Sequence, residues 1–190
     1  ANAREIAEKH NATILIYGVV RKSPNQQWVE LEFEIPANSF NYESEIVGPT
    51  RFGEPIPMTP DSQVDYEANI MFDARTQALK YLVTGLAYFS INDYERAVVE
   101  FRSATDLQNW KSGEGKEVAY MFVGTTLLRN YDPRTDPERN LEEAKKAFES
   151  ALDDNNEYAR IYLGLGAVAR EEAVLNADSA CDGEVDADKL

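Results

Sequence analysis

The stretch from Asp73 to Ala104 constrains the fold more than any other part of the chain, because it predicts two helices folded back on each other. Small and aromatic residues recur in it at spacings of four and three, on either side of a break at Ser90–Asp93: Tyr81, Gly85 and Tyr88, then Ala97, Phe101 and Ala104. Glycine inside a helix costs about 1 kcal/mol relative to alanine. We therefore expect Gly85 to lie where the two helices pack closely.

The same pattern returns twice downstream. It recurs within Glu117–Ala151 as Tyr120, Val123 and Gly124 followed by Leu141, Ala144, Phe148 and Ala151. It begins a third time with Tyr162, Leu165, Gly166 and Ala169. Ala151 and Gly166 are 15 residues apart, the interval that an uninterrupted repeat of about 34 residues predicts. Two full units and the start of a third therefore share one register.

This arrangement resembles the tetratricopeptide repeat (TPR), a helix–turn–helix unit of about 34 residues. The resemblance covers Ala78 to Leu175 and implies a mainly α fold, a TPR array of two full repeats plus part of a third. The chain departs from the pattern in two loops. Ser112–Lys116 adds about five residues between repeats, and Arg129–Asn140 is about eight residues longer than the family's turn. We expect the second loop to be a stiff, solvated excursion.

The N-terminal part predicts a small α+β element. Ala1–His10 is expected to be a helix, and the apolar run Thr13–Val20 a strand buried on both faces. Trp28–Ile35 alternates apolar residues with Glu30, Glu32 and Glu34, which we expect to face solvent. The two strands predict an antiparallel hairpin backed by the helix. This piece resembles the TolB amino-terminal domain, one of the domains that precede helical repeats in some bacterial proteins.

The chain divides into three predicted parts: residues 1–60, the α+β piece with its connector; residues 61–176, the TPR array; and residues 177–190, an acidic tail. The connector Pro36–Pro60 is expected to hold one short strand near Phe40–Val47. Asp61–Phe72 is expected to form a lead-in helix against the first repeat. Asn176–Leu190 is expected to be weakly structured, as a truncated third repeat. The start without methionine indicates a piece excised from a longer protein.

Charge and composition narrow the function classes. The formal net charge of -15 should repel nucleic acid. No run of about 18 apolar residues is present, so we expect no membrane insertion. Cys181 is the only cysteine, which excludes an intrachain disulfide and leaves the compartment open.

No set of residues in the sequence indicates catalysis. His10 is the only histidine, which limits Ser–His and Cys–His pairs. Gly164–Ala169 is close to a dinucleotide fingerprint, but it is predicted to lie inside a helix and not in a turn after a strand. Ser112–Lys116 lacks the full spacing of a phosphate loop. We therefore predict a protein that is not an enzyme, with no cofactor and no metal site.

The TPR resemblance implies a concave groove lined by the first helix of each repeat. Its residues would be Leu79, Leu82, Leu86, Phe89, Val118, Met121, Thr125, Leu128, Arg160, Leu163, Ala167 and Arg170. These are mostly apolar and lack the basic set with which chaperone-binding members hold a carboxylate. An open apolar groove would be an exposed patch. We expect it to be covered, either by the N-terminal piece or by a partner's apolar segment.

The predicted function is a noncatalytic protein–protein interaction or scaffold module. Its partner would carry an apolar segment, favoured to be basic by the acidic rim, or would be a second copy of the chain. Two alternatives remain open. In the first, the chain would be a sensory or regulatory domain of a larger bacterial protein, and its N-terminal piece would bind a small ligand. In the second, it would be an accessory region of a larger enzyme.

Overall fold

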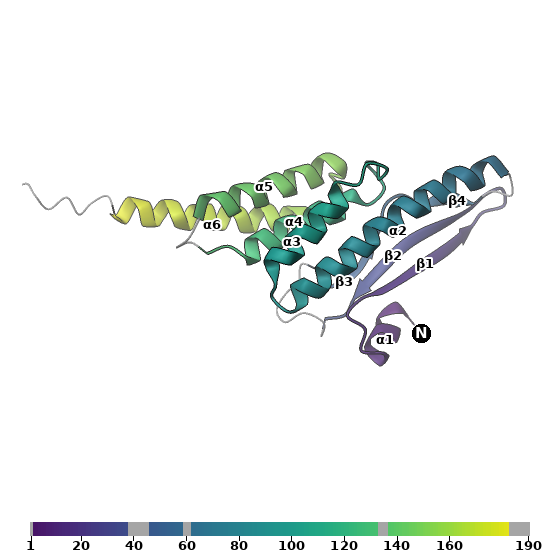
Figure 1. The fold of residues 1–190 in the computed structure, drawn as a ribbon, viewed down its shortest axis with the longest axis horizontal. Coiled ribbons are helices and arrows are strands. Elements are labelled where there is room, and N and C mark those ends of the chain that lie inside the picture. The colour runs from purple at the N-terminus through teal and green to yellow at the C-terminus, as the bar shows by residue number, and fades with distance from the viewer. Residues whose placement is uncertain (1, 38–45, 59–61, 133–136, 183–190) are drawn as a thin grey trace, which may run out of the picture.

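The computed structural model describes residues 2–37, 46–58, 62–132 and 137–182, and it has an α+β fold whose C-terminal part is helical (Figure 1). Over these residues the helices are α1 (Ala3–Lys9), α2 (Ser62–Ser90), α3 (Tyr94–Thr105), α4 (Lys116–Arg129), α5 (Pro137–Asp154) and α6 (Arg160–Asp182). The strands are β1 (Leu15–Lys22), β2 (Gln27–Ile35), β3 (Gly48–Arg51) and β4 (Ile56–Met58). The predicted order of a small α+β element before a helical part is confirmed.

The four strands form one antiparallel sheet built around β2. β1 pairs with one edge of β2 through a short hairpin loop, with Leu15 opposite Glu34 and Lys22 opposite Gln27. β3 and β4 follow each other along the other edge of β2, where Gly48 lies opposite Ile35 and Met58 opposite Gln27. The predicted antiparallel hairpin is therefore confirmed.

The prediction that the first strand is buried on both faces is wrong. Along β1 partly buried and exposed residues alternate, and Ile16 and Val20 are exposed. Among the described strands β1 has β2 as its single neighbour. An apolar run without alternation does not by itself distinguish a central strand from an edge strand.

The prediction that the glutamates of β2 face solvent is also wrong, because Glu30 and Glu34 are buried. The short helix α1 lies on this face of the sheet. Its Ala7 is buried, and its Arg4 forms an ion pair of 3.2 Å with Glu34. Glu32 accepts a hydrogen bond of 2.8 Å from the hydroxyl of Tyr17. Each carboxylate is thus provided with a donor, as buried charges require.

The pKa values on this face follow from the pairing. Burial raises the pKa of Glu30, but hydrogen bonds from Arg21 and Trp28 outweigh burial and hold the pKa below its usual value. Burial and the hydrogen bond to the Glu32 carboxylate raise the pKa of Tyr17 to about 12. The outer face of the sheet is therefore a network of ion pairs and hydrogen bonds.

The predicted lead-in helix and the first repeat helix are one continuous helix, α2, of 29 residues. No glycine or proline lies between Ser62 and Thr84, so nothing interrupts the backbone hydrogen bonds. The predicted break at Ser90–Asp93 is confirmed. Asn92 takes a positive φ of 60° there, and the side chain of Asp93 accepts a hydrogen bond from the backbone N–H of Arg96 at the start of α3.

Three other boundaries differ from the predictions. α5 begins at Pro137, so the last four residues of the predicted Arg129–Asn140 loop are helical; proline is favoured in the first turn of a helix. α6 continues to Asp182, so the predicted weakly structured segment is helical over all of its described residues. The connector holds two strands, β3 and β4, whereas the strand predicted near Phe40–Val47 falls mainly outside the described residues.

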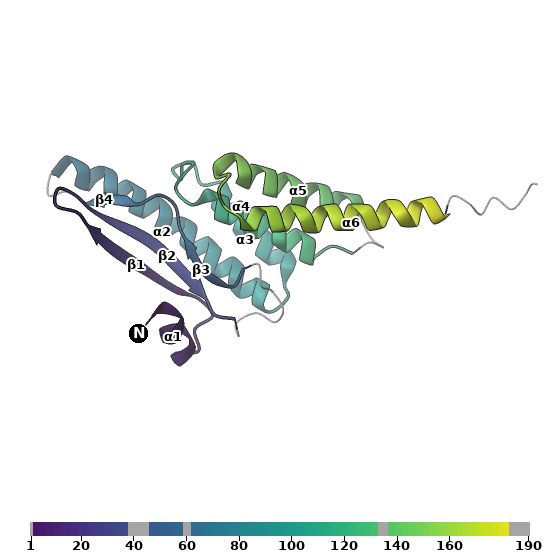
Figure 2. The ribbon, with the colours of Figure 1, turned by 180° about the vertical axis from the view of Figure 1, so that it is seen from behind.

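The sheet and the helices share one hydrophobic core. Successive helices from α2 to α6 pack against each other, and α4 also contacts α6 (Figure 2). A chain of aromatic rings crosses from the sheet into the helices, with centroids of Phe52 at 5.4 Å from Trp110, Phe33 at 6.3 Å from Phe122, and Phe122 at 5.1 Å from Phe101. The boundary predicted near residue 60 therefore separates two segments that pack into a common core.

Candidate interaction site

Most of the predicted groove residues of α2 and α4 are buried inside the single chain. Leu82 and Met121 are each 1% exposed. Leu86, Phe89, Val118 and Thr125 are buried as well, and Leu79 and Leu128 are half-buried. Freely exposed Leu82 and Met121 would have contradicted the expectation of a covered groove. The chain itself buries this part of the groove.

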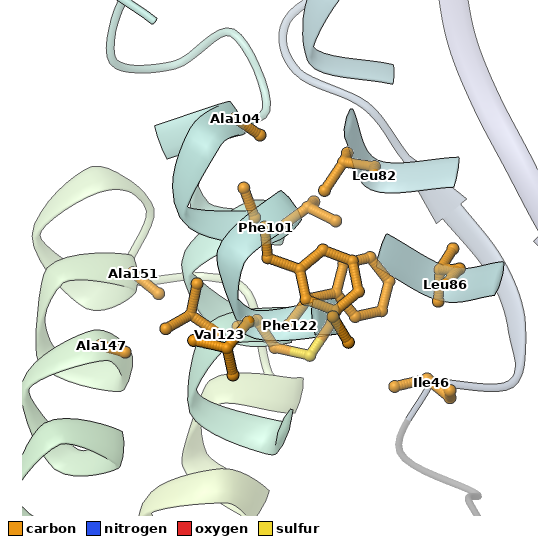
Figure 3. Packing of buried hydrophobic residues seen from close by; sticks show 14 of the residues in the cluster. Ile46, Leu82, Leu86, Phe101, Ala104, Phe122, Val123, Ala147 and Ala151 are labelled. Carbon is orange, nitrogen blue, oxygen red and sulfur yellow. The ribbon is translucent and has the colours of Figure 1, made fainter. Parts of the chain in front are cut away.

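The cover comes from the inner face of the sheet and the segment that leads into β3. Phe33, Ile35, Ile46 and Phe52 belong to the same buried cluster as the helix residues. Figure 3 shows Leu82, Leu86, Phe101 and Phe122 gathered in this cluster, with Ile46 at its edge. Of the two covers proposed from the sequence, the N-terminal piece is the one present.

Arg75 on α2 attaches the β3–β4 segment to the helices. Its Nη1 donates hydrogen bonds to the backbone oxygens of Glu54 at 2.7 Å and Phe52 at 3.4 Å. The side chain is fully buried, and burial lowers its pKa below the usual value of an arginine. Sequence reasoning missed this residue. Its position seven residues before Leu82, on the buried stripe of the helix, was the signal that could have found it.

Arg160, predicted to face the groove, joins the first turn of α6 to β3. Its Nη2 donates to the backbone oxygen of Val47 at 2.8 Å, and its Nη1 donates to the hydroxyl of Thr50 at 3.1 Å. Charge-assisted hydrogen bonds of this kind are among the stronger polar contacts in proteins. The sheet is thus fixed to the helical part at both α2 and α6.

The part of the groove that the sheet does not fill is a cavity between α4 and α6. This α4–α6 cavity has a volume of about 460 Å³ and is lined by Thr125, Leu128, Arg129, Tyr131, Arg160, Leu163, Gly164, Ala167, Arg170 and Glu171. Leu163 is 64% exposed at its wall. Six of the predicted groove residues therefore meet here, away from the covered half.

The α4–α6 cavity is cationic although the chain is strongly acidic. Three arginines and one glutamate are among its lining residues, whereas the whole chain carries a formal net charge of -15. Arg170 forms an ion pair of 2.6 Å with Glu171, and Arg160 is held against β3. The sequence did not predict this local reversal of charge, because Arg129 and Tyr131 enter from the end of α4 and the loop after it.

A second, polar cavity of about 620 Å³ lies where the β3–β4 segment meets α4 and the end of α5. Glu117 and Asp154 line it, and Asp154 accepts a hydrogen bond of 3.1 Å from the backbone N–H of Glu117. Asn155 donates to Glu117 Oε1 at 3.4 Å, and Oε2 is buried with no hydrogen-bond partner among the described residues. Burial and the neighbouring Asp154 carboxylate raise the pKa of Glu117 to about 7.

The glycine-rich stretches serve packing in this structure. A Cβ atom added at Gly53 would lie 2.3 Å from the backbone of Glu114, so the Ser112–Lys116 loop lies directly against the β3–β4 turn. Gly164 and Gly166 lie within α6 and not in a turn after a strand. Gly164 meets the ring of Phe148, whereas the predicted packing glycine, Gly166, has no atom within 4 Å of an added Cβ.

The described residues contain no group of three or more His, Cys, Asp or Glu side chains placed to hold a metal ion. In the same part of the chain, no helix combines the length and the apolar character needed to cross a membrane. No protein-family model, curated protein sequence or solved structure matches this chain.

Proposed function

We propose that α2–α6 form a TPR-like array that acts as a noncatalytic protein-interaction module, and that the α4–α6 cavity is its partner site. The packing between helices supports a TPR-like array. A Cβ atom added to Gly85 would lie 2.4 Å from the Phe101 ring, and one added to Gly124 would lie 2.7 Å from the Phe148 ring. The first helix of each proposed repeat, α2 or α4, thus has a glycine against which a phenylalanine of the next helix packs.

The exposed leucine in the cationic cavity carries the proposal. Leu163 is 64% exposed, and Leu128 and Ala167 line the same cavity. An apolar surface surrounded by polar residues is typical of a protein-binding site. The other half of the groove is occupied by the sheet, so the α4–α6 cavity is the part left for a partner.

The charges of the cavity select the chemistry of the partner. The lining residues carry three arginines against one glutamate, and arginine binds carboxylates with paired hydrogen bonds. We therefore propose an acidic segment that also carries a large apolar side chain, in place of the basic segment expected from the overall charge. The apolar side chain would pack on Leu163, and the carboxylates would lie near Arg129 and Arg170.

Fluorescence anisotropy with three labelled peptides tests this proposal. The peptides share leucines at helical spacing and differ only in having glutamate, glutamine or lysine at the other positions. We expect the glutamate peptide to bind most tightly and the lysine peptide least. The affinity of the glutamate peptide should fall as the salt concentration rises, because salt screens the attraction between its carboxylates and the arginines of the cavity.

Two variants locate the binding site. Leu163→Ser should weaken binding of the glutamate peptide about tenfold, because a buried leucine contributes about 1.5–3 kcal/mol. Val99→Ser, a matched change at an exposed position on α3, should leave binding unchanged. Equal binding of all three peptides, or an equal effect of the two variants, would contradict the proposal.

A further inference from the structure

Among the described residues, none pairs with the outer edge of β1 at any point along the strand. Leu15–Lys22 pairs with β2 on one side, and no other described strand pairs with it. No other backbone hydrogen bond joins these eight residues to another described segment. A free strand edge of this length is a template for pairing with another strand, and proteins usually protect such edges.

The inner face of β1 is apolar and uncovered. Ile16 lies opposite Phe33 and Val20 opposite Val29, so both point to the face on which the helices pack. They are nevertheless 41% and 54% exposed, because α2 covers the β4 side of the sheet and β1 is the strand farthest from α2 (Figures 1 and 2). The core face of the sheet therefore continues past the helices onto an open edge.

The paired edge would contain no carboxylate of β1. Its sequence, LIYGVVRK, contains two basic residues and no acidic residue, in a chain of net charge -15. The nearest carboxylates of β2 are already engaged, because Glu30 is paired with Arg21 and Glu32 accepts from Tyr17. A second copy can approach this edge without bringing unpaired carboxylates together.

We propose that β1 pairs antiparallel with β1 of a second copy, in a register centred on Gly18. The two exposed apolar residues, Ile16 and Val20, lie two positions before and after Gly18, so this register places Ile16 of each copy opposite Val20 of the other. Directly opposite residues share a face, and the two apolar strips then form one continuous surface. The contact is isologous, as a two-fold dimer requires.

Two further features fit this register. Arg21 and Lys22 of the two copies lie at opposite ends of the paired strands, so like charges do not meet. Gly18 at the two-fold axis has no side chain, and a Cβ there would already lie 3.2 Å from Val29 Cγ1. Glycine within a strand commonly marks a close approach of another backbone.

Light scattering during size-exclusion chromatography, over a range of protein concentrations, tests the association. We expect wild type to reach twice the monomer mass, and the Ile16→Lys, Val20→Lys double variant to stay monomeric with an unchanged circular dichroism spectrum. Val99→Lys, at an exposed apolar position on α3, should remain dimeric. A monomeric wild type, or a dimer that survives the double variant, would overturn the proposal.

A spin-label distance tests the register without altering the paired strand. Cys181 is replaced by serine, and Ser23, in the exposed loop after β1, is replaced by a labelled cysteine. The two labels should lie about 33 Å apart, because each residue 23 is ten strand positions from the other at about 3.3 Å per position. A dimer with a clearly different distance would refute the Gly18-centred register.

Discussion

Glu117 illustrates how one buried residue sets a pH response. Its pKa is raised from its ordinary value of 4.5 to about 7 by burial and by Asp154. Because the folded protein holds this proton more tightly than the unfolded chain, the contribution of Glu117 to the free energy of unfolding falls as the pH rises from about 4.5 through 7. Above pH 7 the ionised side chain destabilises the fold by up to about 3 kcal/mol.

Glu117→Gln removes this penalty. Glutamine keeps an oxygen to accept the hydrogen bond from Asn155 but carries no charge. The difference in free energy of unfolding between variant and wild type should therefore be small at pH 4.5 and should favour the variant by about 1–3 kcal/mol at pH 8. Urea titrations at both pH values measure it. A difference that does not change with pH, or that matches the exposed control Glu149→Gln, would contradict the assignment.

Two glycines of α6 form a matched pair. A Cβ at Gly164 would lie 2.3 Å from the Phe148 ring, whereas a Cβ at Gly166 would meet nothing within 4 Å. Gly166→Ala should stabilise the protein by up to about 1 kcal/mol, and Gly164→Ala should destabilise it by about 1–3 kcal/mol through overpacking. Chemical denaturation of the two variants decides this. Changes of the same sign would contradict the packing described for α6.

At the scale of elements, the sequence predicted the helices well where glycine and aromatic spacing marked them. The break before α3 was found because Asn92 and Asp93 carry local turn and capping signals. α2 runs through the boundary predicted near Phe72, because no helix breaker follows Ser62 before the first repeat helix. Local chemistry was the better guide to that boundary.

The sheet was predicted less well, because its burial depends on distant segments. The alternation in β2 correctly placed Phe33 and Ile35 on one face, but the cover over the glutamates comes from α1 and from arginines elsewhere in the chain. Nor does the sequence of β1 reveal that α2 stops short of it. Similarly, the sequence does not reveal that the sheet packs on the predicted groove residues of α2 and α4, whereas six of the predicted residues line the α4–α6 cavity.

The docking of the sheet predicts a single unfolding unit. Phe33 is 1% exposed and lies between the rings of Phe52 and Phe122. Phe33→Ala should lower the free energy of unfolding by about 3–5 kcal/mol. Unfolding of this variant, followed by helical circular dichroism and by tryptophan fluorescence, should still give one transition with the same midpoint for both probes. Separate transitions, with the helical signal unaffected by the substitution, would show that the sheet and helices α2–α6 fold independently.

At the scale of the whole molecule, the predicted groove has one half that the sheet covers and one half that is open as the α4–α6 cavity. The sheet fills the surface of α2 and α4, Arg75 and Arg160 hold it there, and the α4–α6 cavity remains with a positive lining. Small-ligand sensing by the N-terminal piece, and a role beside a catalytic region, remain predictions from the sequence. The polar cavity beside Glu117 is where a ligand of the first kind would be sought.

Methyl NMR of the protein titrated with the glutamate peptide locates the partner site directly. We expect chemical-shift changes at Leu128, Leu163 and Ala167, which line the open cavity, and none at Leu82 and Met121, which the sheet covers. In the Leu163→Ser variant, the changes at Leu128 and Ala167 should need about tenfold more peptide to reach half of their full size. Shifts centred on Leu82 and Met121, or no shifts at any of these methyl groups, would contradict the assignment of the α4–α6 cavity as the partner site.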